Sequence, residues 1–73
     1  MNLTHNIIEY VVCCVGVFAK HFKLTNYQAY AYLKRFDGID FLVDCYNAEH
    51  TLSINDAIED LTAICQKNGG RLS

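Results

Sequence analysis

The residues best able to do chemistry in this chain are four cysteines: Cys13 and Cys14 are adjacent, and Cys45 and Cys65 stand alone. Thiolates favour zinc, but structural zinc sites commonly use a C-x-x-C pair, which this sequence lacks. Neighbouring residues on a helix also point about 100° apart, so Cys13 and Cys14 are poorly placed to chelate one ion together. We therefore expect reduced, mostly buried thiols, with no metal and no other cofactor.

The segment Glu49-His50-Thr51 is the most polar point of an otherwise apolar neighbourhood. In a catalytic interpretation, Glu49 would orient His50 as a general base. No serine or cysteine nucleophile is evidently paired with this histidine. In the structural interpretation, His50 caps a helix end or binds a backbone carbonyl of the connection. We favour the structural role and expect no enzyme, with a small enzyme using His50 as the weaker alternative.

The element that the others must pack against is the most apolar stretch of the chain, Ile7–Ala19, whose only charged residue is Glu9. Its valines favour a strand by propensity. Five apolar side chains nevertheless recur at the spacing of one helical face: Ile7, Val11, Val15, Phe18 and Phe22. We predict a helix over residues 5–22, apolar around most of its circumference. The apolar run is too short for a bilayer, which needs roughly 20 residues.

Three further helices are predicted, over residues 26–36, 39–46 and 54–67, and a strand is an alternative for the second of these. Residues 47–52 form a connection without glycine or proline, which we expect to be packed. The sequence thus predicts a small all-α domain, residues 1–73, built as a bundle of four helices.

Local signals mark the helix ends. Thr4 or Asn6 is expected to cap the first helix, because either side chain can accept from an exposed backbone N–H. Thr25 and Gln28 fit the T-x-x-Q pattern of a capping box. Gly38 stands where a left-handed residue commonly ends a helix, and we predict that conformation for it.

The charge balance argues against nucleic acid. The net charge is −2 and the pI is about 5.8, whereas nucleic-acid modules are usually basic. A helix-turn-helix over residues 25–46 would present Asp40 and Asp44 to phosphates, which would repel them. No secretory signal peptide is recognisable either. We expect a cytoplasmic protein that binds neither nucleic acid nor a membrane.

Aromatic and acidic side chains suggest a protein partner instead. Tyr27, Tyr30 and Lys34 lie on the face of the second predicted helix opposite its core stripe, and tyrosine is enriched at interfaces. Acidic residues of the next helix and connection would meet a basic partner surface, although such residues are more often simply solvated. The predicted partner-binding set is Tyr27, Tyr30, Lys34, Asp40, Asp44, Glu49 and His50. The alternative is a structural homodimer that buries the first helix.

Several motifs also carry a family resemblance. They are YAYL (Tyr30–Leu33), GIDFL (Gly38–Leu42), Tyr46 with His50-Thr51-Leu52, and the acidic amphipathic segment Asp56–Leu61. In this order, after an apolar first helix, they resemble a family of small bacterial proteins of unknown function, DUF3791. The resemblance implies a companion of a neighbouring ADP-ribosyltransferase-like protein, similar to a toxin–antitoxin or effector–regulator pair. It implies no catalytic residues.

Overall fold

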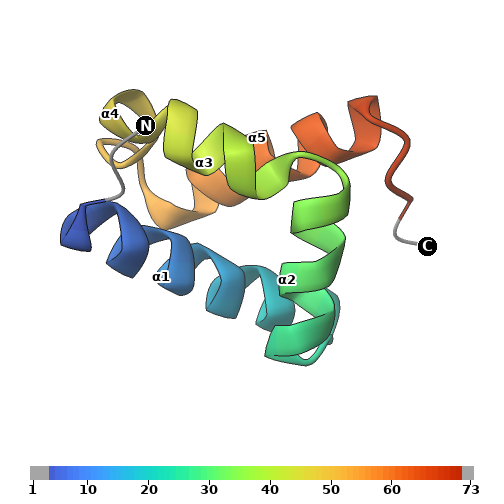
Figure 1. Cartoon of the computed structure of the whole chain (residues 1–73). Coiled ribbons are helices and arrows are strands. Elements are labelled where there is room, and N and C mark those ends of the chain that lie inside the picture. The colour runs from blue at the N-terminus through green and yellow to red at the C-terminus, as the bar shows by residue number, and fades with distance from the viewer. Residues whose placement is uncertain (1–3, 72–73) are drawn as a thin grey trace.

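The computed structural model describes residues 4–71, and every regular element in that range is a helix (Figure 1). In chain order the helices are α1 (His5–Phe22), α2 (Asn26–Arg35), α3 (Gly38–Asp44), α4 (Tyr46–Glu49) and α5 (Ile54–Lys67). The predicted all-α class is therefore confirmed. Residues 1–3 and 72–73 of the predicted domain lie outside the described range.

The connection after α3 contains a helical turn that the sequence did not predict. The third helix ends at Asp44 rather than Tyr46, and α4 follows as a single turn. Cys45 joins the two, because its carbonyl accepts hydrogen bonds from the backbone N–H groups of Ala48 at 3.0 Å and Glu49 at 2.8 Å. The connection is thus ordered by its own backbone bonds, but the expectation that it is packed is wrong for most of it, because Glu49 is the one buried residue of 47–52.

The helices surround one apolar core. In Figure 1, α2 stands across one end of the molecule between α1 and α3, and α5 runs behind α3. The first helix packs against α2, α3 and α5, and α3 packs against α2 and α5. The buried apolar side chains are Cys14, Val15, Phe18, Ala19, Ala29, Leu33, Leu42, Ala57, Ile58, Leu61 and Cys65. Each long helix contributes one stripe, as the helical spacing predicted.

Two of the predicted helix caps are confirmed. The hydroxyl of Thr4 accepts from the backbone N–H of Ile7 at 3.3 Å. At α2, the Thr25 hydroxyl accepts from the backbone N–H of Gln28 at 3.1 Å, and the Gln28 side chain accepts in return from the backbone N–H of Thr25 at 3.0 Å. These bonds satisfy donors that a helix start leaves free.

The prediction for Gly38 is wrong. The left-handed residue is Asp37, with φ of 67°, and Gly38 is the first residue of α3. Aspartate tolerates that conformation better than most residues. Glycine is needed at 38 for a different reason, since a Cβ there would lie 2.9 Å from Leu33 Cδ2 and 3.0 Å from Cys65 Sγ. The absence of a Cβ at Gly38 lets α3 approach α2 and α5 closely.

Candidate functional site

An apolar groove lies on the surface between α1 and α2. It has a volume of about 360 Å³ and is lined by Val11, Val12, Val15, Asn26, Tyr27 and Tyr30. Three of these side chains are substantially exposed, with Val12 at 65%, Tyr27 at 80% and Tyr30 at 43%. Ile8, one turn before Val12, is 48% exposed. We call this surface the α1–α2 groove.

The groove exists because α2 covers only part of α1. The short turn after Phe22 places α2 beside the C-terminal half of α1, where Val15 and Ala19 are buried. Figure 1 shows the N-terminal half of α1 extending beyond α2, and Ile8 and Val12 in that half are 48% and 65% exposed. The sequence indicated that α1 is apolar on nearly all sides, and the packing decides which flank remains uncovered.

The two halves of the chain differ in charge. In residues 4–35, which form α1 and α2, four basic residues stand against Glu9 alone, for a net charge of +3 with histidine neutral. In residues 36–71, which hold α3 to α5, seven acidic residues stand against Lys67 and Arg71, for a net charge of −5. The groove therefore belongs to the basic half of an acidic protein.

A buried carboxyl group marks the acidic half. Glu49 is only 6% exposed, and its oxygen Oε1 has no hydrogen-bond partner within residues 4–71. Glu49 and Asp60 line the same shallow depression beside α5, together with Phe41 and Lys67. Burial raises the pKa of the Glu49 carboxyl to about 7, and a hydrogen bond with Asp60 and the negative charge of that residue add to the effect.

A comparison with known protein families identifies a family that matches this chain. The sequence profile of a family described as "Protein of unknown function (DUF3791)" matches residues 9–68. The chain belongs to the DUF3791 family. No curated protein and no solved structure matches it. The matched range includes both the α1–α2 groove and the Glu49 region, and the family description assigns an activity to neither.

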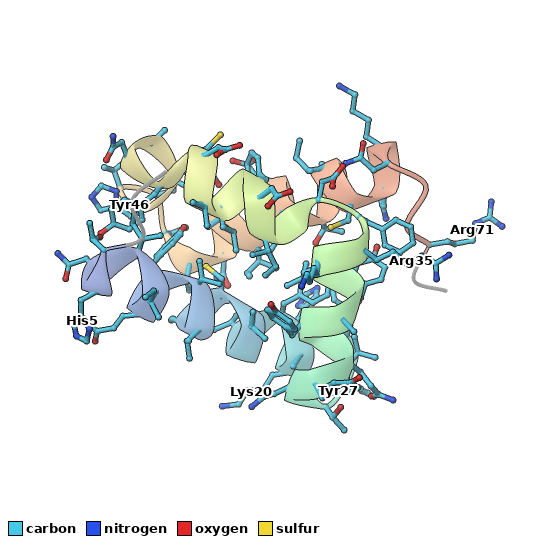
Figure 2. All side chains as sticks on the ribbon, viewed as in Figure 1. His5, Lys20, Tyr27, Arg35, Tyr46 and Arg71 are labelled. Carbon is cyan, nitrogen blue, oxygen red and sulfur yellow. The ribbon has the colours of Figure 1, made fainter. Side chains whose placement is uncertain are left out.

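The predicted partner-binding residues of this DUF3791 member divide into two groups. Tyr27, Tyr30 and Lys34 are exposed on α2. The remaining exposed members, Asp40, Asp44 and His50, lie on or after α3 and α4. Figure 2 shows Tyr27 and Tyr46, which begins α4, at opposite ends of the molecule. The two groups therefore come from different elements of the fold.

Glu49 departs from its predicted setting, because it is buried and does not present its carboxylate on the surface. Sequence reasoning also left the valines of α1 out of the predicted binding set, although they line the groove. The i, i+4 spacing of Ile8 and Val12 on an all-round apolar helix was the available signal. It could not identify the open flank without the position of α2.

The His50 side chain contacts groups of its own segment in this DUF3791 fold. Its Nδ1 lies 2.6 Å from the backbone carbonyl oxygen of Tyr46, which can only accept, so Nδ1 carries the proton. The His50 ring stacks on the Tyr46 ring at 4.3 Å between centroids, and Tyr46 meets Tyr10 of α1 edge-on at 5.4 Å. The predicted bond from His50 to a backbone carbonyl is confirmed. Within residues 4–71 no hydrogen bond joins His50 to Glu49.

The four cysteines are free and differ in burial. Of the thiols expected to be mostly buried, Cys14 and Cys65 are buried, Cys45 is half-buried and Cys13 is exposed. Burial raises the pKa of the Cys14 and Cys65 thiols to about 11, which keeps them protonated at neutral pH. The described part of the chain brings no three His, Cys, Asp or Glu side chains together as a metal site. Nor does it contain a helix with the length and apolar character to cross a membrane.

Proposed function

We propose that the protein is a non-catalytic protein-binding module whose partner docks in the α1–α2 groove. The observation that carries this proposal is the exposure of Val12, Tyr27 and Tyr30 in one groove of a 73-residue chain. Contiguous apolar exposure is costly in water and commonly marks an interaction site. Tyrosine is also among the residues that contribute most to binding when an interface closes over them.

The proposed partner is an ADP-ribosyltransferase-like protein, and the proposed role is antitoxin-like or regulatory. Membership in DUF3791, together with the gene setting that the resemblance implies, supports this partner. The mechanism would be occlusion, in which the small domain covers the functional cleft of the larger protein. Free thiols agree with a reducing cytoplasm as the place of action.

The experiment that tests this proposal is a binding titration with the neighbouring ADP-ribosyltransferase-like protein. Calorimetry would compare the wild type with the double variant Tyr27→Ala, Tyr30→Ala. Because buried aromatic side chains at an interface are often worth more than about 1 kcal/mol each, we expect affinity to fall at least about tenfold.

The matched control is the double variant Asp40→Ala, Asp44→Ala, which changes two exposed residues of α3 outside the groove. It should bind like the wild type. If the tyrosine variant also binds like the wild type, the groove is not the docking site. If only the aspartate variant loses affinity, the binding surface lies on the acidic half.

A second candidate function is a structural homodimer, favoured by the exposure of Ile8 and Val12 on α1. Light scattering at micromolar concentration separates the two functions. A dimer that Val12→Glu converts to a monomer would establish self-association through this flank. A monomeric wild type would count against it.

A further inference from the structure

The α1–α2 groove has a shape and a charge that define the partner segment that fits it. We infer that the groove receives an amphipathic α-helix of another protein, with acidic side chains on both sides of its apolar stripe. This inference rests on the proposed function and adds the chemistry of the partner. Three observations support it: the groove's walls, its backbone and its charge.

Both walls of the groove are helices. Val11 and Val15 are one turn apart on α1, and Tyr27 and Tyr30 are nearly one turn apart on α2. Rows of side chains at i, i+3 and i, i+4 form the ridges between which side chains of another helix pack. An apolar groove between two helices is the receptor in the helix-in-groove mode of recognition.

The groove offers few free backbone groups to an extended peptide. Most of the residues that line it lie inside α1 and α2, where N–H and C=O groups bond within the helix; the exceptions are the N–H groups of Asn26 and Tyr27, which begin α2. A strand lying in the groove would leave its own backbone donors and acceptors unpaired against valine and tyrosine. A helix satisfies its backbone internally, so it can enter an apolar groove without that cost.

Exposed basic side chains lie on both helices that form the groove. Lys20 is exposed in the last turn of α1, and Lys34 is exposed one turn beyond Tyr30 on α2. Figure 2 shows Lys20 and Tyr27 projecting at the same corner of the molecule, where α1 ends and α2 begins. Glu9, the one acidic residue of these two helices, lies 2.8 Å from His5 near the start of α1. Acidic residues of a partner would complement this surface.

The same charges disfavour a second copy as the occupant. Joining two grooves by a two-fold axis would place one +3 half against another. Joining the groove to the acidic half of another copy would give a head-to-tail contact, which forms rings or open filaments rather than a dimer. An acidic helix of a different protein meets neither difficulty.

The test uses two designed helical peptides with the same leucine and phenylalanine stripe and a fluorescent label. One has glutamate at all flanking positions and the other has lysine. Fluorescence anisotropy with the full chain should show at least about tenfold tighter binding of the glutamate peptide at low salt. The ratio should shrink toward one near 1 M salt, where the screening length is about 3 Å.

Charge-reversal variants sharpen the test. The double variant Lys20→Glu, Lys34→Glu should lose the preference for the glutamate peptide, because both changes lie on the groove helices. The matched control is Lys67→Glu, which makes the same kind of charge change on α5 and should keep the preference. Circular dichroism checks that each variant remains helical. Backbone amide shifts induced by the glutamate peptide should centre on Val12, Tyr27 and their neighbours.

Each other outcome overturns the inference. Equal or tighter binding of the lysine peptide contradicts the acidic flanks, and absence of binding by both peptides contradicts a helix as occupant. Amide shifts centred on α5 contradict the groove as the location of binding. A dimer that forms through α1 would mean that a second copy, rather than a helix of another protein, occupies the groove. These failures differ from failure of the proposed function, in which the Tyr27→Ala, Tyr30→Ala variant keeps full affinity for the neighbouring protein.

Discussion

The two halves of this molecule, residues 4–35 and 36–71, differ in how much apolar surface they leave exposed. Helices α3 and α5 place Leu42 and Leu61 fully inside the core, and their acidic residues mostly face water. Helices α1 and α2 contribute to the same core but leave Val12 and Tyr27 largely exposed beside basic residues. The acidic half buries a carboxyl group, that of Glu49, whereas the exposed large apolar side chains other than Leu52 belong to the basic half.

This difference shows that high hydrophobicity in a small chain need not mean a larger core. A domain near this size buries only about 60% of the surface of its unfolded chain, so each helix has limited cover. Because α2 covers only one end of α1, part of the apolar surface of α1 remains available. We interpret the acidic half as the part that mainly stabilises the fold. We interpret the basic half, which carries the α1–α2 groove, as the part that binds a partner.

The prediction with the largest expected effect compares Leu61 in the core with Val12 in the groove. Leu61→Ala should lower the free energy of unfolding by about 2–5 kcal/mol, because it leaves a cavity in the core. Val12→Ala removes apolar atoms that already face water and should change it by less than about 0.5 kcal/mol. Urea denaturation followed by circular dichroism measures both. A Val12→Ala cost close to that of Leu61→Ala would mean that the groove is covered in the free protein.

The second prediction concerns the pH dependence of the free energy of unfolding, which follows from the raised pKa of Glu49 in the acidic half. The folded-state pKa of about 7 lies above the ordinary value of 4.5. Folding therefore favours the protonated carboxyl, and its contribution to stability is complete below pH 4.5 and is lost as the pH rises through 7. The expected loss is up to about 3 kcal/mol, at 1.36 kcal/mol per pKa unit. Urea denaturation at several pH values from 4.5 to 8 measures it.

The groups that face Glu49 define the controls for this pH test. Asp60 and Lys67 line the depression beside it, and on α1 the charge of Glu49 contributes to raising the pKa values of Tyr10 and Cys14. Glu49→Gln keeps the shape of the side chain and should remove most of the dependence. Glu59→Gln, on the exposed face of α5, should leave the dependence unchanged. An equal pH profile for Glu49→Gln and the wild type would assign the dependence to another group.

The prediction with the smallest expected effect compares Gly38 with Gly16. Gly38→Ala should lower the free energy of unfolding by about 1–3 kcal/mol, because its new methyl group would be pressed against Leu33, Leu61 and Cys65. Gly16→Ala, inside α1 with no atom within 4 Å of the added Cβ, should raise it by about 0.5–1 kcal/mol. Thermal unfolding distinguishes the two signs. A stabilising Gly38→Ala would show that α3 can shift outward without cost.

Features that depend on neighbours in sequence were predictable. The four longer helices follow from helical spacing of apolar residues, and the cap at Thr25 follows from side chains three residues apart. The bond from His50 to the Tyr46 carbonyl spans one turn and was also within reach of sequence reasoning. In each case the interacting groups are brought together by local backbone geometry alone.

Other features were decided only by tertiary packing. The need for glycine at position 38 comes in part from Leu61 and Cys65 of α5, which lie close to it in space and are distant in sequence. Glu49 is buried where its side chain lies among residues of α3 and α5, and nothing in its own segment indicates those neighbours. The sequence by itself determined that α1 is apolar on more than one side. Only the position of α2 decided which flank is covered, since burial depends on the surface that meets a helix as well as on its own pattern.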